Sequence, residues 1–392
     1  MKEVYIVSMA RTPIGSLNGI LADYSATQLG AHVIKNAVER AGIPAEAIEE
    51  VFMGNVLQAN NGQAPARIAA LAAGLSPSTV CTTINKVCAS GMKAIMLGYN
   101  SIKSGDNDVV LAGGMESMTN SPYYLPKGRN GMRYGNAEIL DAIVRDGLQD
   151  PYKGYMMGNT AEVCAEKFGC TREAQDAYAL SSYARASEGY KAGAFNDELA
   201  PLIQTDKKGN TITIGEDEEY KKLIPEKVAL LKPAFKTDGT VTAVNASKIN
   251  DGAAAMVLMS AEAVKKYNVK PIAKILSVAD AAQEPEWFTT TPSLAIPKAL
   301  NKVGMTTENV DVFEVNEAFS VVAIANYQLM KISPDKINVL GGAVALGHPI
   351  GASGCRIVCT LISALKYKSG KIGAAGICNG GGGASALVVE LV

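Results

Sequence analysis

Residues 80–114 read VCTTINKVCASGMKAIMLGYNSIKSGDNDVVLAGG. The apolar run at 80–85 predicts a strand, the run at 90–104 predicts a helix, and the run at 108–114 predicts a buried strand that ends in glycines. Strand, helix and strand in this order form the repeating unit of a parallel sheet with crossover helices. The stretch therefore predicts an α/β fold.

The same alternation precedes this stretch. Residues 4–8 and 50–53 predict strands, whereas residues 26–41 and 64–74 predict helices.

The C-terminal part of the chain repeats this plan. Residues 271–278 correspond to the first strand, residues 312–317 correspond to residues 51–55, and the helix after Gly351 corresponds to the helix after Cys88. We interpret this as an internal duplication of two similar halves, with a pseudo-twofold pair of sheets.

A region of different character separates the halves. Residues 120–240 contain polar loops and are predicted to be an insertion that binds substrate. Thr171 is the expected N-cap of a helix in this insertion, and residues 216–222 are expected to be a charged surface segment.

The composition excludes several classes of protein. With 392 residues, 48% of them hydrophobic, the chain can form a large core, and its length favours two or three domains. The net charge of −1 provides no general attraction to nucleic acid or membranes, and we see neither a membrane-spanning run nor a signal or transit peptide. The seven cysteines lack paired Cys-x-x-Cys spacing, which favours a reducing cytoplasm, and the only two histidines lack metal-ligand spacing.

Cys88 is the first candidate for chemistry because it lies between a predicted strand and a predicted helix. Backbone N–H groups at a helix N-terminus favour a thiolate, so we expect the pKa of Cys88 to be lowered. A single cysteine in this position is more often a small buried hydrophobic residue. We assign the other cysteines except Cys378, and also His32, to structural roles.

Two glycine-rich segments add further reactive groups. His348 lies between Gly347 and Pro349, and Cys378 precedes four glycines at the end of a predicted strand. Asn316 lies at a third strand end, where it could hold an oxygen atom or simply cap a helix. Sites in α/β proteins form at such strand ends, and two thiols with an imidazole suit the exchange of acyl groups between sulfur and carbon.

These segments together resemble the signature motifs of the thiolase family. The matching stretches are Asn85-Lys86-Val87-Cys88-Ala89-Ser90-Gly91, Asn316-Glu317-Ala318-Phe319, Gly347-His348-Pro349-Ile350-Gly351 and Cys378-Asn379-Gly380-Gly381-Gly382. The resemblance covers essentially the whole chain and is closest to the biosynthetic acetyl-CoA acetyltransferases. It implies the thiolase fold, in which two βαβαβαββ halves form five αβαβα layers with an inserted loop domain.

The resemblance also implies domains, partners and a location. Residues 1–119 with 241–270 would form the N-terminal half, residues 120–240 the loop domain for coenzyme A binding and tetramer formation, and residues 271–392 the C-terminal half. The expected protein is a cytoplasmic homotetramer that binds acetyl-CoA, acetoacetyl-CoA and coenzyme A, without a prosthetic group.

The implied reaction is a reversible ping-pong Claisen condensation. Cys88 would take an acetyl group as a thioester, and Cys378 would remove a proton from the methyl carbon of a second acetyl-CoA. His348 would activate Cys88 and, with a water held by Asn316, stabilise the enolate. The N–H groups of Cys88 and Gly380 would stabilise the oxyanion.

The resemblance assigns further residues to ligands. Those implied for coenzyme A are Tyr183, Lys222, Lys227, Ser247, Met157, Phe235 and Phe319. A potassium ion, if bound, would be held by Tyr183, Ala243, Val244, Ala246 and Val344. The chain departs from the family at Met156, where a histidine is frequent, and at Thr289, where a proline follows the phenylalanine in relatives that use branched substrates.

Three alternatives stay open at this point. The first is a degradative 3-ketoacyl-CoA thiolase for longer chains. The second is a ketoacyl synthase, against which the second thiol at Cys378 argues. The third is a silent acyl-CoA or lipid carrier, which the retention of Cys88, His348, Cys378 and Asn316 disfavours.

Overall fold

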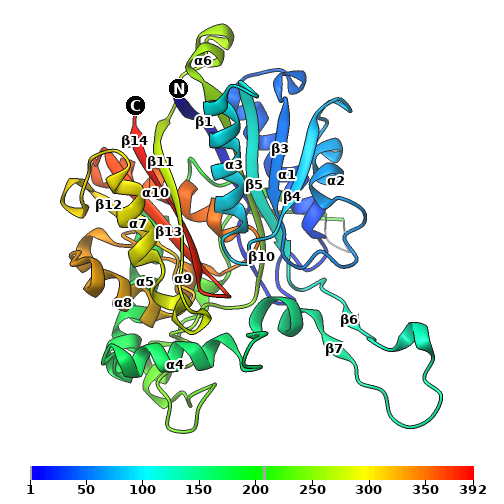
Figure 1. Cartoon of the computed structure of the whole chain (residues 1–392), viewed down its shortest axis with the longest axis vertical. Helices are drawn as coiled ribbons and strands as arrows, with labels where there is room; N and C mark the ends of the chain where they lie inside the picture. Colours follow the sequence, from blue (N-terminus) through cyan, green and yellow to red (C-terminus); the bar gives the residue numbers. More distant parts are fainter. Residues whose placement is uncertain (1, 206–208) are drawn as a thin grey trace.

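The computed structural model describes residues 2–205 and 209–392, so that residues 1 and 206–208, in the predicted regions 1–119 and 120–240, lie outside the described residues. Within the described residues, ten strands form one mixed sheet (Figure 1). Its main path runs in the order β12-β13-β14-β11-β1-β10-β5-β3-β4, and β2 pairs with β10. The α/β class predicted from the sequence is confirmed.

In the N-terminal half of the sheet, β1, β3, β4 and β5 run in one direction and β10 runs in the opposite direction. β3 lies parallel to β4 and β5, whereas β10 lies antiparallel to β5 and β1. The bounds are β1 (Val4–Arg11), β3 (Glu50–Gly54), β4 (Val80–Ile84), β5 (Val109–Ser117) and β10 (Asn250–Ser260). Since β10 follows the insertion, the chain returns from the loop region to complete this half.

The C-terminal half repeats the pattern. β12 (Val312–Val315) is parallel to β13 (Ile372–Asn379), and β14 (Gly383–Leu391) is antiparallel to β13 and to β11 (Ala273–Ala282). A parallel bridge between Phe313 and Ile337 takes the place that β4 has in the first half. The predicted duplication is therefore present in the topology. The predicted pair of sheets is instead one continuous sheet, because β1 of the first half pairs with β11 of the second.

Helices cover both halves and separate them. α1 (Ala26–Ala41) and α2 (Pro65–Ala72) pack on the N-terminal half, and α7 (Pro292–Asn301), with α8 (Ser320–Met330) beside it, packs on the C-terminal half. α3 (Ser90–Ser104) and α10 (Ser353–Lys368) lie between the halves and contact strands of both. Three hydrophobic clusters fill the spaces between these layers, which gives the predicted αβαβα order.

The first turns of α3 and α10 touch. A Cβ atom on Gly91 would lie 2.8 Å from the backbone nitrogen of Cys355, and one on Gly354 would lie 2.2 Å from that of Met92. No other residue type fits such a close approach, so these glycines allow the two central helices to cross at their N-terminal ends.

The described residues of the loop region form two α-helices and two small pairs of antiparallel strands. These are α4 (Met157–Lys167), α5 (Arg172–Lys191), β6 (Tyr123–Tyr124) with β7 (Leu140–Asp141), and β8 (Leu202–Thr205) with β9 (Thr211–Ile214). β6 and β7 form the base of an arm that projects from the body of the molecule (Figure 1). The predicted N-cap is confirmed, since the Thr171 side chain accepts the N–H of Ala174.

The expectation of a charged surface segment at residues 216–222 is wrong for its central residues. Asp217 is fully buried and accepts two hydrogen bonds, of 2.7 and 3.0 Å, from the guanidinium of Arg11. Glu219 is buried as well and accepts from Ser16. Charged residues that have buried partners cannot be distinguished by composition from a solvated surface.

The remaining elements are short. They are β2 (Gly15–Ser16), α6 (Ala261–Tyr267), α9 (Ala343–Leu346), a π-helical turn (Ile143–Leu148), and 3-10 helices at Ala45–Ala47, Gly128–Asn130, Glu219–Lys222, Pro225–Leu230, Pro285–Thr290, Thr307–Asn309 and Pro334–Lys336. In the described part of the chain, every helix is too short or too polar to cross a lipid bilayer.

Candidate active site

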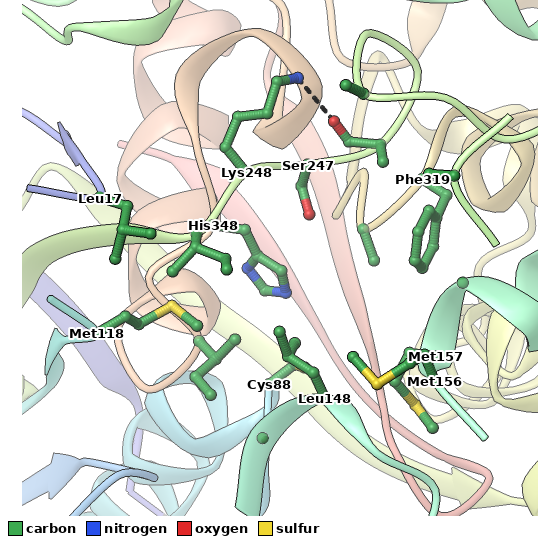
Figure 2. A pocket seen from close by; sticks show the side chains of 18 of the residues that line it. Leu17, Cys88, Met118, Leu148, Met156, Met157, Ser247, Lys248, Phe319 and His348 are labelled. Atoms are coloured by element: carbon green, nitrogen blue, oxygen red, sulfur yellow. Dashed lines mark hydrogen bonds between the residues drawn. The ribbon is translucent and has the colours of Figure 1, made fainter. Parts of the chain in front are cut away.

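A cavity of about 620 Å³ is lined by residues of both halves and of the loop region. Cys88, Ser247 and His348 are among the polar residues that line it (Figure 2). Much of the wall is apolar, and includes Met118, Leu148, Met156, Phe235, Phe319 and Ile350. An apolar cavity with a few convergent polar groups is the usual form of a small-molecule site.

Cys88 lies in a tight turn between β4 and α3. The Asn85 side-chain oxygen accepts the N–H of Val87 (3.0 Å). The Ser90 hydroxyl accepts the N–H of Lys86 (2.8 Å) and donates to the carbonyl of Val87 (2.6 Å). Val87 has a φ of 48°, which is unusual for a β-branched residue, so these side-chain bonds hold a strained turn that presents Cys88 to the cavity.

The Cys88 thiol is protonated in the free protein. Burial raises its pKa to about 12, although the backbone N–H groups of Gly380 and of Cys88 itself favour the thiolate. The sequence-based expectation of a lowered pKa is therefore wrong, because loss of water outweighs the effect of the helix end. A base is needed to activate this thiol.

His348 lies on the loop between α9 and α10. Its backbone N–H donates to the Asn250 side-chain oxygen (2.9 Å). Gly347 has a φ of +112°, and a Cβ atom there would lie 2.7 Å from the Asn250 side chain. Glycine at this position therefore permits the contact that fixes the loop.

The hydrogen bonds around His348 indicate its tautomer. The Ser353 hydroxyl donates to the carbonyl of Pro349 (2.9 Å), and its oxygen lies 2.6 Å from Nδ1 of His348. Because the single hydroxyl proton is engaged at Pro349, Ser353 accepts the Nδ1 proton. Nε2 is then unprotonated and lies 3.4 Å from the amide nitrogen of Asn316.

Arg356 acts on this imidazole and on Asn316. Burial, followed by the positive charge of Arg356, lowers the pKa of His348 to about 3, so the ring is neutral at physiological pH. Arg356 also donates to the side-chain oxygen of Asn316 (3.4 Å), which turns the amide NH2 group toward His348. Asn316 is itself buried, directly after β12.

Cys378 lies near the end of β13, opposite Ala384 of β14, and is only 1% exposed. Burial raises its pKa, and the nearby Cys88 thiol raises it further. The loop that follows brings Gly380 to the cavity wall. The fold therefore brings together Cys88, His348, Asn316, Cys378 and Gly380, the five residues that the sequence analysis selected for catalysis.

The residues selected for coenzyme A are divided between the cavity and its surroundings. Those that line the cavity are Met157, Lys222, Phe235, Ser247 and Phe319. Tyr183 is buried behind this wall, and Lys227 is exposed on a short 3-10 helix. Lys222 also pairs with Glu218 at 2.8 Å, so the carboxylate competes with any anionic ligand for this lysine.

Three of the five residues selected for potassium contact Lys248. The carbonyl oxygens of Ala246 and Val344 accept hydrogen bonds from its Nζ at 2.7 and 3.3 Å, and the Tyr183 ring centroid lies 5.6 Å from Nζ. Ala243 lines the cavity and Val244 is buried. Burial lowers the pKa of Lys248 to about 8, against the opposing influence of Glu219 and Glu317.

Of the two positions that depart from the family motifs, Met156 lines the cavity and Thr289 follows a residue that does. Met156 and Met157 occupy one side of it (Figure 2). Phe288 contributes to the wall, whereas Thr289 is fully buried. A thioether is only a weak acceptor, so Met156 makes this side of the cavity more apolar than a histidine would.

Sequence reasoning missed Ser353, Asn250, Arg356 and Lys248. Ser353 and Arg356 follow His348 by five and eight residues. Their contacts with His348 and Asn316 form only because the chain enters α10 at Ser353, and this change of direction cannot be read from the spacing. Lys248 had a weak signal, because it interrupts an otherwise mostly apolar run before a buried strand. Its partners at Val344 and Tyr183 are too distant in the chain to be read from spacing.

Models of known families match almost the entire chain. The thiolase N-terminal domain matches residues 4–262, and the thiolase C-terminal domain matches residues 269–391.

Curated relatives and solved structures agree with this result. A cytosolic acetyl-CoA acetyltransferase of Gibberella zeae is 54% identical, and the mitochondrial acetyl-CoA acetyltransferase of Mus musculus is 53% identical. The alignments cover 100% of this chain and 98% and 91% of these relatives. The crystal structure of the Acat5 thiolase from Ascaris suum in complex with coenzyme A superposes with a TM-score of 0.95 at 48% identity, over 100% of both chains. This chain belongs to the thiolase family.

Proposed function

We propose that this protein is an acetyl-CoA C-acetyltransferase, which condenses two molecules of acetyl-CoA to acetoacetyl-CoA and coenzyme A and also catalyses the reverse thiolysis. The observation that carries the proposal is the meeting of the Cys88 and Cys378 thiols with the unprotonated Nε2 of His348 beside one apolar cavity. The names of the relatives at 54% and 53% identity support acetyl-CoA as the substrate.

The first half-reaction transfers an acetyl group to Cys88. Nε2 of His348 takes the thiol proton as the sulfur attacks the thioester carbonyl carbon of acetyl-CoA. The raised pKa of Cys88 and the lowered pKa of His348 both favour the neutral pair, so the charge develops only when the carbonyl arrives. Coenzyme A leaves as a thiolate and takes a proton from Cys378.

The second half-reaction uses the Cys378 thiolate formed in the first. This thiolate removes a proton from the methyl carbon of a second acetyl-CoA, and the resulting carbanion attacks the acetyl-Cys88 carbonyl carbon. Cys88 then leaves as a thiolate paired with protonated His348. Because Cys378 is buried, its thiolate is poorly solvated and therefore a strong base.

Hydrogen-bond donors are available for both developing oxyanions. The N–H groups of Gly380 and Cys88 favour the Cys88 thiolate and would donate to the tetrahedral oxyanion of its thioester. The Asn316 amide faces His348 and would hold a water against the enolate oxygen. Preorganised donors of this kind contribute about 3–4 kcal/mol each in known enzymes.

Coenzyme A would enter through the loop-region side of the cavity. Met157, Phe235 and Phe319 offer apolar surface to pantetheine, and Ser247 offers a hydroxyl. Lys222 and Lys227 would meet the phosphates, and Tyr183 would support the wall from behind. The Ascaris suum thiolase binds coenzyme A in its crystal structure, which supports this ligand.

The proposed reaction needs coenzyme A thioesters and no prosthetic group. A potassium ion at the carbonyl oxygens of Ala246 and Val344 would have to share them with the Lys248 ammonium.

A homotetramer is the assembly that we propose. The arm, including its base at β6, exposes Tyr123, Met132, Tyr134 and Ile139, and Tyr134 is fully exposed. β4 is an edge strand whose first residue, Val80, is 59% exposed. Exposed apolar groups on an arm and an open sheet edge are features that a second copy of a chain can cover.

The cytoplasm is the proposed location. All seven cysteines are free, as expected in a reducing compartment, and the Gibberella zeae relative is named cytosolic. The Mus musculus relative is named mitochondrial, so fractionation of cells that produce the native protein is the relevant test.

We propose the domain division predicted from the sequence, with residues 1–119 and 241–270, residues 120–240, and residues 271–392 as units. Pairing of β10 with both β1 and β5 supports the split N-terminal unit.

Thiolysis of acetoacetyl-CoA by the purified protein and free coenzyme A tests the proposal, alongside 3-ketoacyl-CoA substrates with six to sixteen carbons. We expect activity to be highest with the four-carbon substrate. Higher activity on long chains would instead identify the degradative 3-ketoacyl-CoA thiolase, and no activity on any substrate would contradict both.

Two variants separate the proposed roles. Cys88→Ala should fail to gain an acetyl group from acetyl-CoA, whereas Cys378→Ala should still gain one, detected by intact-protein mass spectrometry, yet lose condensation by about 10²–10⁴-fold. Near-normal condensation by Cys378→Ala would refute its assignment as the base.

A further inference from the structure

Lys248 places a positive charge in the cavity wall next to Ser247 (Figure 2). Its Nζ donates to the carbonyl oxygens of Ala246 (2.7 Å) and Val344 (3.3 Å). The face of the Tyr183 ring lies 5.6 Å away, measured from Nζ to the ring centroid. Backbone carbonyl oxygens and an aromatic face are the groups that proteins use to hold a desolvated monovalent cation.

The two carbonyl groups belong to segments that are far apart in the chain. Ala246 precedes Ser247 on the cavity rim, and Val344 belongs to α9, which ends immediately before Gly347 and His348. The ammonium of Lys248 therefore bonds the rim of the cavity to the helix that leads into the imidazole loop.

Two buried carboxylates complete the surroundings. Glu317 accepts the N–H of Val344 (3.1 Å) and holds α9 from the side of β12. Glu219 belongs to the loop region and accepts a hydrogen bond from the hydroxyl group of Ser16. Both carboxylates interact electrostatically with Lys248. An uncharged side chain at position 248 would leave these buried charges less compensated.

We propose that the Lys248 ammonium is a built-in monovalent cation that joins the cavity rim to α9, so that the protein works without bound potassium. Removal of the side chain would leave a space beside the carbonyl oxygens of Ala246 and Val344 and the Tyr183 ring that a potassium ion can occupy. We call this space the cage. The inference relies on the proposed function only for its activity measurement, because occupation of the cage can also be followed through stability.

Steady-state thiolysis in potassium, sodium and choline chloride at equal ionic strength tests the inference. The wild type should have the same kcat/KM in all three salts, within about twofold. Lys248→Ala should lose at least about tenfold in choline chloride and recover most of that loss with potassium in a saturable manner. Potassium should likewise raise the melting temperature of Lys248→Ala more than choline does.

Two control variants separate the cage from general effects of charge. Lys248→Met removes the charge but keeps a long side chain in the space, so it should lose activity without recovery by potassium. Lys265→Ala removes an exposed lysine from α6, at the opposite end of the molecule from α4 (Figure 1), and should behave as the wild type in every salt.

Several outcomes would overturn the inference. They are activation of the wild type by potassium, unchanged activity of Lys248→Ala in choline, and equal recovery of the alanine and methionine variants. If Lys248→Ala fails to fold, the wild type still tests the inference, because its activation by potassium would contradict a built-in cation. If the wild type lacks thiolase activity in all salts, the proposed function fails, and the salt-specific melting of Lys248→Ala still tests the cage.

Discussion

The reactive residues of this site are neutral before substrate arrives. Burial raises the pKa of Cys88 to about 12 and lowers that of His348 to about 3, so neither thiolate nor imidazolium is stable in the empty cavity. A neutral thiol resists oxidation and alkylation at neutral pH, because the thiolate is the reactive form. Reactivity should therefore appear only together with an acyl-CoA carbonyl.

The pH dependence of alkylation tests the state of Cys88. The raised pKa keeps the thiolate fraction small, so inactivation by iodoacetamide should accelerate about tenfold per pH unit between roughly pH 7 and pH 10 without levelling off. Peptide mapping confirms that Cys88 is the labelled residue, with Cys88→Ala as the control. A plateau beginning near pH 7 would mean that the thiolate is already formed.

Ser353 is a positioning residue for His348, because it accepts the Nδ1 proton. In Ser353→Ala the buried Nδ1–H group of His348 loses its hydrogen-bond acceptor, which should lower the free energy of unfolding by about 1–3 kcal/mol. Because the ring is then less well oriented, kcat should fall by at least about tenfold. Ser353→Thr retains the hydroxyl and serves as the matched control. With only two histidines in the chain, nitrogen NMR can follow the tautomer directly. An unchanged tautomer in the alanine variant would contradict this role.

Among the elements, β11 supports the nucleophile from the opposite half. Asp280 of β11 binds Lys86 (2.5 Å), which belongs to the Cys88 turn, and Lys93 (2.6 Å) of α3. Burial opposes the charge of Asp280, but its hydrogen bonds with Lys86, Lys93 and Ser385 lower its pKa to about 2. The two halves are thus linked by charge beside the nucleophile.

This link gives stability a pH dependence. The folded pKa of about 2 lies below the ordinary value of 3.8, so the carboxylate stabilises the fold above about pH 4 and loses this effect as the pH falls toward 2. Allowing for solvent screening at a side chain that is 36% exposed, Asp280→Asn should cost about 1–2 kcal/mol at pH 7. Urea unfolding should show the difference shrinking below pH 5. Exposed Asp335→Asn should show no such trend, and a constant difference would refute the assignment.

Single elements were predictable where local chemistry dominates. The helix expected at residues 26–41 has those bounds because Ser25 and Gln28 form a capping box and Gly42 ends it in the left-handed conformation. The Cys88, His348 and Cys378 set was found because each stands in a distinctive local segment. The burial of Asp217 was missed because its partner, Arg11, is about two hundred residues away, and the pKa of Cys88 was missed because burial is a property of the whole fold.

At the scale of the whole molecule, the arm between β6 and β7 projects away from the body of the protein (Figure 1). Its aromatic residues Tyr123 and Tyr134 are 68% and 103% exposed. Such exposure in a stable protein is explained if another subunit covers the arm.

Shortening this arm tests the assembly. Replacement of residues 125–138 by a short Gly-Ser linker should convert the proposed tetramer into a smaller oligomer while leaving the cavity residues in place. Sedimentation equilibrium gives the mass of the assembly, and Tyr134→Ser provides a milder variant. An unchanged mass for the shortened protein would show that the arm is not part of the interface.

The crossing of α3 and α10 has a consequence for the energy of the site. Each helix N-terminus carries a partial positive charge of about half an elementary unit, and here two of them touch at their first turns, at Gly91 and Gly354. Because the duplication supplies one dipole from each half, their fields add near the crossing. In the proposed reaction a single negative charge passes from sulfur to oxygen and back to sulfur, and this paired field favours that charge whichever atom bears it.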